Sequence, residues 1–139
     1  MQNLAHKFIV DAHILVWYLE GKKRLSEKVQ EIMDAADSQM VLPLIALAEV
    51  VHIVERGRTN IPTDSDLLTD VYSDKRIEIY PLTMEVFKRS LTAEGQKIPE
   101  MHDRFIVSTG LHLQDLGYSV SIMTKNGDIT RAGVLPVVW

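Results

Sequence analysis

Short apolar runs alternate along this chain with longer segments in which apolar residues recur every three or four positions. A continuous apolar run suits a buried strand, whereas the longer spacing is typical of a helix with one buried side. We therefore expect strands over residues 6–10, 40–42, 77–80, 120–124 and 136–139. Helical segments separate these strands, and the alternation predicts an α/β fold with a parallel sheet, helices on both faces and right-handed crossovers.

Capping residues set the bounds of the expected helices. Ser26, Thr63 and Thr83 each precede a helical pattern and suit the N-cap position, where a hydroxyl accepts a backbone N–H. Asp66 completes a capping box with Thr63, and Pro43 suits the first turn of a helix. These signals place helices over residues 12–19, 27–36, 43–56, 64–72, 84–93 and 102–116, with a polar loop over 94–100 before the last one.

Composition narrows the class of protein without indicating a chemistry. The chain has 139 residues, of which 46% are hydrophobic and 24% charged, as expected of one globular domain over residues 1–139. It has no cysteine, which excludes disulfides, thiolate metal sites and cysteine nucleophiles. No apolar run approaches the roughly 18 residues of a membrane span, so we expect no membrane partner and a cytoplasmic location.

Carboxylate or amide side chains stand beside apolar runs in four segments that lie far apart in the chain. They are Asp11 in FIVDAHILVW, Glu49 in LIALAEVVHIV, Asp103 in PEMHDRFIVSTG, and Asn126 with Asp128 in SIMTKNGDI. Acids are costly to bury unless their charge is compensated, and a shared divalent cation is the simplest compensation. Because ligands bind outside the carboxyl ends of parallel strands, the four segments can converge on one pocket that binds metal and handles phosphate.

Each of these residues also has an ordinary structural explanation. Asp11 could cap the helix that follows it, and Asp103 lies in a first helical turn, where the helix dipole favours an acid. Asn126 precedes a glycine, as in many turns, and Asp128 could cap a terminal helical turn. Glu49 lies among apolar neighbours, although one side of its helix could still face water. It is the set of positions, and no single residue, that indicates a site.

Other chemistry is disfavoured by the motifs that the sequence lacks. It contains no P-loop, no GxGxxG or GxSxG motif, and no HExxH motif or zinc-type spacing of histidines. His13 lies one helical turn from Trp17 and is expected at the rim of the pocket. The net charge of −4 indicates no bulk attraction to nucleic acid, so any such contact needs a local basic patch or metal ions as the bridge.

The same segments, in the same order, resemble the PIN-domain nucleases, and in particular the VapC-type toxins of toxin–antitoxin pairs. The likeness runs through FIVDAHILVWYL, LIALAEVVHIVERGR, PEMHDRFIVSTGL, MTKNGDI and the terminal VVW. It implies a parallel five-stranded sheet flanked by helices and an acidic pocket that binds Mg²⁺ or Mn²⁺. It also implies an endoribonuclease that hydrolyses phosphodiester bonds in RNA, a cognate antitoxin protein and a homodimer.

Residue by residue, the resemblance implies catalytic and metal-binding roles. Asp11, Glu49 and Asp103 match the family's first three acids. Around them we expect four residues to contact the substrate, two of which would steer the phosphate backbone. The four are His13, Arg104, Thr124 and Lys125, and the two that steer are Arg104 and Lys125.

The fourth segment departs from the family's pattern of threonine, any residue and aspartate, because it reads Thr124-Lys125-Asn126. The amide oxygen of Asn126 can still coordinate a hard cation and keep a place in the catalytic set, but it brings no negative charge. Asp128 is an alternative ligand if the chain bends around Gly127. A second metal ion should therefore bind more weakly than in relatives with aspartate at this position.

Three functions stay open at this point. The first is a metal-dependent endoribonuclease that is the toxin of a toxin–antitoxin pair, with a basic side chain of the antitoxin entering the acidic pocket. The second is a binding module for RNA or protein that kept the fold and lost efficient chemistry, as Asn126 suggests. The third is a nuclease of the same fold that processes RNA or acts on DNA.

Overall fold

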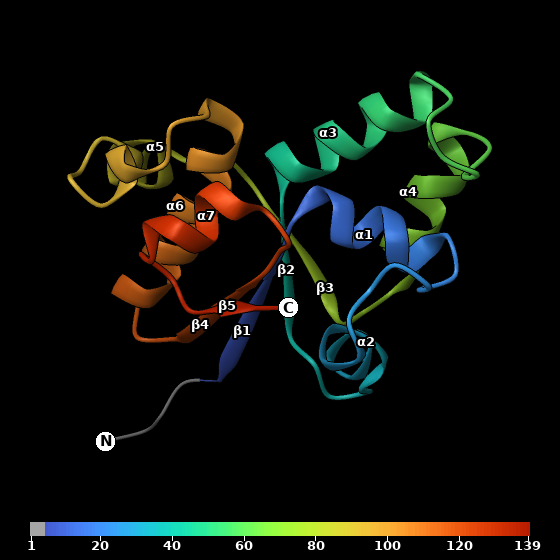
Figure 1. The fold of residues 1–139 in the computed structure, drawn as a ribbon, viewed down its shortest axis with the longest axis horizontal. Coiled ribbons are helices and arrows are strands. Elements are labelled where there is room, and N and C mark those ends of the chain that lie inside the picture. Colours follow the sequence, from blue (N-terminus) through green and yellow to red (C-terminus); the bar gives the residue numbers. More distant parts are fainter. Residues whose placement is uncertain (1–4) are drawn as a thin grey trace.

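Five parallel strands form one sheet in the order β3-β2-β1-β4-β5 (Figure 1). The structure is a computed structural model, and it describes residues 5–139. The strands are β1 (His6–Val10), β2 (Met40–Pro43), β3 (Ile77–Tyr80), β4 (Ser119–Met123) and β5 (Val137–Val138). The helices are α1 (Ala12–Leu19), α2 (Glu27–Asp34), α3 (Leu44–Glu55), α4 (Asp64–Ser73), α5 (Met84–Ser90), the 3-10 helix η1 (Gly95–Lys97), α6 (Met101–Asp115) and α7 (Gly127–Ala132).

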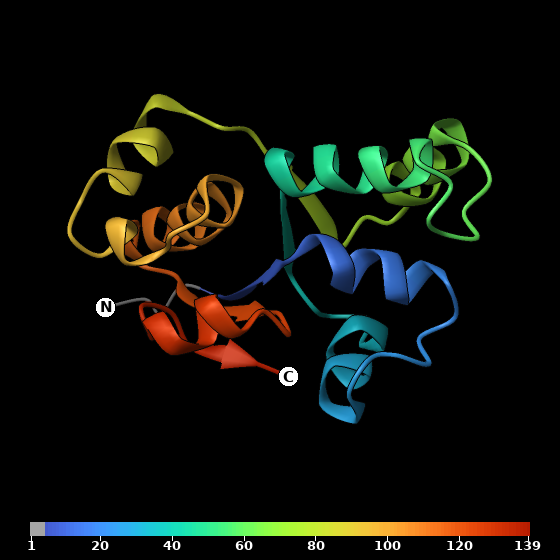
Figure 2. The same ribbon diagram turned by 45° about the horizontal axis from the view of Figure 1, so that its top comes forward.

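The helices gather into two groups around the sheet. In Figure 1, α1 to α4 lie to one side and α5, α6 and α7 to the other, with the strands between them. The same division is visible after a 45° rotation (Figure 2). This arrangement confirms the expected α/β fold with a parallel five-stranded sheet. Among residues 5–139, no helix combines the length and the apolar character needed to cross a membrane.

The expected N-caps are confirmed. The hydroxyls of Ser26, Thr63 and Thr83 each accept a hydrogen bond from the backbone N–H three residues on, at 3.1 to 3.2 Å. Asp66 differs from a capping box in one detail, since its carboxylate accepts from the hydroxyl of Thr63. These helices begin where the sequence predicts because the hydroxyls satisfy N–H groups that a helix leaves unpaired.

Two helices end earlier than the sequence pattern predicts. α5 stops at Ser90 and not near residue 93, because the hydroxyls of Ser90 and Thr92 donate to backbone carbonyls of the last turn and compete with the helix. The polar loop that follows contains η1. α2 stops at Asp34, which leaves Ala36 outside the helix that we expected over residues 27–36.

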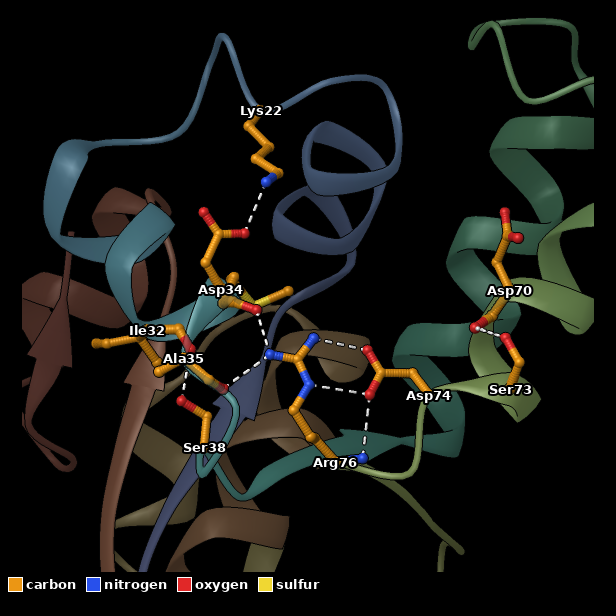
Figure 3. A network of polar contacts seen from close by, with 10 residues as sticks. Lys22, Ile32, Asp34, Ala35, Ser38, Asp70, Ser73, Asp74 and Arg76 are labelled. Carbon is orange, nitrogen blue, oxygen red and sulfur yellow. Dashed lines mark hydrogen bonds and ion pairs between the residues drawn. The ribbon is translucent and has the colours of Figure 1, made fainter.

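Arg76 explains the early end of α2. Its Nη1 donates to the backbone carbonyls of Met33 and Ala35 at 2.6 and 2.9 Å, while Nε and Nη2 bind the two carboxylate oxygens of Asp74 (Figure 3). Carbonyls at the end of a helix need partners from outside it. Arg76, the residue just before β3, supplies them here, and this contact fastens α2 to the sheet.

Further differences lie at the edge of the sheet where the strands end. Pro43 is the last residue of β2 and the N-cap of α3, with an extended ψ of 138°, so it precedes the first helical turn to which we assigned it. Asn126 and Gly127, expected as a turn, begin α7, and Asn126 rather than Asp128 is its N-cap. A helix of only six residues shows little periodicity. Thr124, expected as the end of the fourth strand, lies just beyond β4.

α6 packs closely against the central strands at Gly110. A Cβ atom at this position would lie 2.6 Å from Cδ1 of Leu135 and 3.2 Å from Cγ1 of Ile9, so these side chains would have to shift to accommodate a larger residue. Ile9 and the neighbouring helical residue Ile106 are fully buried, which places this contact in the core. The close approach fixes α6 against β1, and α6 carries Asp103 of the predicted site.

Candidate functional site

The carboxyl ends of β1 and β4 bring two segments of the predicted site together. Val10, the last residue of β1, pairs with Met123, the last residue of β4. The backbone N–H of Asp11 then donates to the carbonyl of Met123 at 3.3 Å, and Thr124 follows directly on the neighbouring strand. Because the strands are parallel, the residues that follow them emerge at one edge of the sheet.

Neighbouring residues hold both carboxylate oxygens of Asp11. Oδ1 accepts from the backbone N–H of Ala12 at 2.8 Å, which caps α1, and Oδ2 accepts from the hydroxyl of Thr124 at 2.5 Å. Asp11 is 7% exposed and Thr124 is fully buried. Asp11 therefore caps α1 and also borders the predicted pocket. The two roles are compatible because a carboxylate has further lone pairs beyond the ones that these two hydrogen bonds use. Thr124 positions this carboxylate.

Glu49 reaches the same region from α3. Its Oε1 atom is buried and has no hydrogen-bond partner in the part of the chain that the structure describes. Burial, and repulsion from Asp11 and Asp103, raise the pKa of Glu49 to about 7. An ionised carboxylate in such surroundings is costly unless a positive charge compensates it. The free oxygen of Glu49 is therefore in a position to bind a cation.

Asp103 comes from the first turn of α6. The N-cap of this helix is Glu100, whose carboxylate accepts from the backbone N–H of Asp103 at 2.8 Å and so fixes the turn. The carboxylate of Asp103 accepts from Nδ2 of Asn126 at 3.1 Å. Burial first, and repulsion from Asp11 second, raise the pKa of Asp103 to about 6, although the amide of Asn126 acts in the opposite direction.

Asn126 is oriented by the helix that it caps. Its Oδ1 accepts from the backbone N–H groups of Asp128 and Ile129 at 2.8 and 3.1 Å, while its Nδ2 donates to Asp103. The amide oxygen that we expected to bind a cation thus already accepts two hydrogen bonds. The fourth position of the site presents a hydrogen-bond donor where an aspartate would present a negative charge.

The three acids and Asn126 line one cavity of about 360 Å³. Its lining residues are Asp11, His13, Ile14, Trp17, Glu49, Asp103, Lys125 and Asn126. His13 and Lys125, both expected at the substrate, therefore lie at this acidic cavity. Thr124 is buried beside Asp11 and is not part of the lining.

Two other predicted site residues lie outside the cavity lining. Nε of Arg104 donates to the carbonyl of Ile98 at 2.9 Å, so its guanidinium is bound to the segment before α6. Asp128 is exposed and forms an ion pair with Arg131, although its charge still raises the pKa of Asp103. The role of Arg104 in binding phosphate and the role of Asp128 in binding metal therefore stay predictions.

The sequence pattern assigns no role to two tryptophans, one of which lies at the acidic cavity and the other beside the first. Trp17 lines it, and the centroid of its ring is 5.7 Å from that of His13 and 6.0 Å from that of Trp139. The helical spacing of His13 and Trp17 is the signal that could have identified Trp17. Trp139 has no comparable signal, because it follows β5 and its place depends on the pairing of β5 with β4.

The donor set fits a hard divalent cation, although it is not preorganised. Oxygen ligands suit Mg²⁺ or Mn²⁺, and Oε1 of Glu49 has no other partner. Among residues 5–139, no three acidic or histidine side chains stand close enough together to form a ready ligand cluster. Mg²⁺ keeps several water molecules and uses one or two carboxylates directly. Asp11, Glu49 and Asp103 would therefore hold the ion partly through water.

In the absence of divalent cations, we expect the stability of the fold to decrease as the pH rises from about 5 to about 8. The pKa values of Glu49 and Asp103 in the folded protein, about 7 and about 6, lie above the ordinary values of 4.5 and 3.8. The folded protein thus holds more protons than the unfolded chain in this range, and raising the pH favours unfolding. Thermal unfolding in EDTA should show a Tm that falls by several degrees.

A double variant, Glu49→Gln with Asp103→Asn, is the control for this pH dependence. It removes both titrating groups, so its Tm should change much less over the same range. Mn²⁺ should restore the Tm of the wild type at the alkaline end, because the cation competes with protons for the same oxygens. A Tm of the wild type that stays level in EDTA would contradict the prediction.

A family model for the PIN domain matches residues 8–134. No curated protein sequence matches the chain. Among solved structures, VapBC2 from Rickettsia felis bound to a fragment of promoter DNA is similar to this chain, with a TM-score of 0.67 and 16% identity. The alignment covers 95% of this chain and 97% of that one.

Two further structures show the same similarity. A toxin–antitoxin complex from Klebsiella pneumoniae has a TM-score of 0.67 and 19% identity, and the match covers 94% of this chain and 95% of that one. FitAcB from Neisseria gonorrhoeae has a TM-score of 0.64 and 16% identity, with 95% and 96% covered. At these identities the similarity establishes the fold and not the activity.

Proposed function

This chain belongs to the PIN domain family, and on that premise we propose that it is a metal-dependent endoribonuclease, the toxin of a toxin–antitoxin pair. Residues 1–139 would form one PIN domain that acts in the cytoplasm and hydrolyses phosphodiester bonds in RNA. The observation that carries the proposal is the convergence of Asp11, Glu49 and Asp103 on one cavity, in which Oε1 of Glu49 has no partner among the described residues.

The residues of the acidic cavity have distinct roles in this proposal. Asp11, Glu49 and Asp103 hold Mg²⁺ or Mn²⁺, and Thr124 keeps the carboxylate of Asp11 in place through their hydrogen bond of 2.5 Å. A bound divalent cation supplies an activated water molecule and stabilises negative charge on the attacked phosphate. Lys125 attracts the phosphate backbone to the cavity, in a protein whose net charge of −4 otherwise repels it.

The surface next to the acidic cavity supports an antitoxin partner. Structures with this fold include toxin–antitoxin complexes, and we extend the proposal to an antitoxin for this chain. A mostly apolar cavity of about 530 Å³ lies along α3 and shares His13 and Glu49 with the acidic cavity. A protein segment bound there could place a basic side chain at the carboxylates, where charge-assisted hydrogen bonds are strong.

Exposed apolar side chains support the proposed homodimer. Leu44, Leu82 and Phe87 are 46%, 42% and 41% exposed. Leu44 and Leu82 line a common hollow with Phe105, and the ring centroids of Phe87 and Phe105 are 6.4 Å apart. Adjacent apolar groups on a surface are typical of a protein–protein contact, and a second copy of the chain would cover them.

A binding module without efficient catalysis is the second candidate, and Asn126 favours it. The oxygen of its amide is bound to helix N–H groups, and the nitrogen donates to Asp103. The fourth position therefore offers no uncommitted oxygen to a cation. Such a protein would bind RNA or a partner protein with little metal-dependent turnover.

Purified protein incubated with a pool of structured RNAs tests the proposal. We expect cutting with Mn²⁺ or Mg²⁺ and none in EDTA, because the carboxylates need the cation to activate water. A DNA pool run in parallel separates a ribonuclease from a nuclease that acts on DNA. No cutting of RNA with either metal would count against the ribonuclease and favour the binding module.

A further inference from the structure

A row of aromatic and basic side chains extends from the acidic cavity along α1. Trp17 lines the acidic cavity and also borders a smaller cavity of about 240 Å³. The other lining residues of this second cavity are Glu20, Lys23, Arg24 and Asn60. The proposed chemistry uses none of them. Because one ring borders both cavities, an extended ligand held at the carboxylates would cross Trp17 on its way to the second cavity.

The only two tryptophans of the chain, Trp17 and Trp139, meet at this point. Their ring centroids are 6.0 Å apart and the ring planes are inclined by 65°, so the rings are not stacked face to face. Trp139 is 38% exposed and Trp17 is half-buried. Two adjacent, incompletely covered indoles beside a cavity form a surface on which a planar ring can stack.

Cationic groups surround the two indole rings. Nζ of Lys125 lies 5.3 Å from the centroid of one ring, and Cζ of Arg24 lies 5.9 Å from the centroid of the other. Lys23 adds a further positive charge in the second cavity. Glu20 is the opposing charge there, and its carboxylate accepts a hydrogen bond from the hydroxyl of Thr59 at 2.8 Å. In the second cavity two basic side chains face one carboxylate, and this excess of positive charge favours an anionic ligand there.

We infer that Trp17 and Trp139 form a stacking subsite for an unpaired base next to the cleaved phosphate, with Lys23, Arg24 and Lys125 binding the flanking phosphates. The inference rests on the proposed function and names its substrate class, which is single-stranded RNA. Bases in a duplex are stacked on one another, whereas an unpaired base can lie on an aromatic side chain. Since every base has an aromatic face, this subsite accepts any sequence.

Intrinsic fluorescence measures the stacking directly, because both tryptophans of the protein belong to the subsite. The whole protein is titrated in Ca²⁺ with a single-stranded RNA of about eight nucleotides, and the RNA is checked for cleavage afterwards. We expect saturable quenching of the fluorescence. An abasic strand of the same length and a blunt RNA duplex should each bind at least about tenfold more weakly.

Variants separate the contribution of stacking from that of charge. Trp17→Leu and Trp139→Leu should each weaken binding about tenfold, and Trp17→Phe should retain most of it because phenylalanine also stacks. Arg24→Ser should weaken binding severalfold. It should also reduce the slope of log affinity against log salt concentration by about one. Tyr72→Leu and Lys88→Ser are the matched controls, since both residues are exposed outside the two cavities and should not affect binding.

Two results would overturn the inference. One is a pair of leucine variants that fold, bind the strand as tightly as the wild type and cut RNA with an unchanged KM. The other is equal binding of the abasic strand or the duplex. Neither result would contradict the ribonuclease function, provided that the wild type cuts RNA in Mn²⁺. Conversely, strand binding that Trp17→Leu and Trp139→Leu both weaken, in a protein that cuts no RNA, would support the subsite and contradict the nuclease.

Discussion

Replacing Asp11 with asparagine should reduce the cleavage of RNA by more than about a hundredfold. Asparagine has nearly the same shape, and it can still accept from the N–H of Ala12 and donate to the hydroxyl of Thr124, so the fold should remain intact. The variant loses the negative charge that holds the cation. Changing a residue that only supports a metal ligand costs about 10- to 100-fold, so changing the ligand should cost more. Initial rates in Mn²⁺ measure the loss.

The same Asp11→Asn variant should be more stable than the wild type in EDTA near neutral pH. Asp11 raises the pKa of Glu49 and of Asp103 by repulsion, so removing its charge stabilises the folded protein when no cation is present. We expect the Tm to rise by a few degrees. Asp37→Asn, at an exposed position outside the acidic cavity, is the control and should change neither rate nor Tm. Full cleavage by Asp11→Asn would disprove the role of this carboxylate.

Replacing Asn126 with aspartate should raise cleavage by about tenfold and lower the Mn²⁺ concentration that gives half of the maximal rate. Aspartate caps helices as well as asparagine does, so α7 should form unchanged. The variant brings a fourth carboxylate to the cavity and removes the amide that donates to Asp103. Ligand charge is a main determinant of cation affinity. In EDTA the Tm should fall, because a like charge beside Asp103 raises its pKa further.

Thr130→Asp is the matched control for this experiment, since it adds the same charge to an exposed position of α7 outside the cavity. It should leave the cleavage rate and its dependence on Mn²⁺ unchanged. A gain confined to Asn126→Asp identifies a catalytic site that is weakened at one position. When neither the wild type nor Asn126→Asp cuts RNA, the binding module is the function that stays.

The sheet and most of the helices could be predicted from the sequence because their signals are local. β1 ends in the apolar run Phe8-Ile9-Val10, and Ser26 and Thr83 cap helices within three residues of themselves. The start and N-cap of α7 could not be predicted, because asparagine followed by glycine is typical of a turn and Asp128 suggested a later cap. The end of α2 could not be predicted either, since it depends on a contact between Met33 and Arg76, which are 43 positions apart.

The convergence of the three acids on one cavity could be predicted because each stands beside an apolar run in a fold whose strand ends share one edge. The orientation of Asn126 could not, because it depends on which backbone N–H groups are unpaired where α7 begins. The place of Trp139 could not either, since it reaches Trp17 only after β5 has paired with β4. These contacts depend on the arrangement of distant segments and leave no local pattern.

The hydrogen bond between Asp11 and Thr124 joins residues that are 113 positions apart. During synthesis, Asp11 leaves the ribosome long before Thr124, and the pairing of β1 with β4 must wait for the same distant segment. Until then the nascent chain has Asp11 without the cavity that Lys125 and Asn126 complete. In the proposed ribonuclease, the unfinished chain therefore has no complete site with which to cut the messenger and ribosomal RNA beside it, because the site assembles only after translation has passed Asn126.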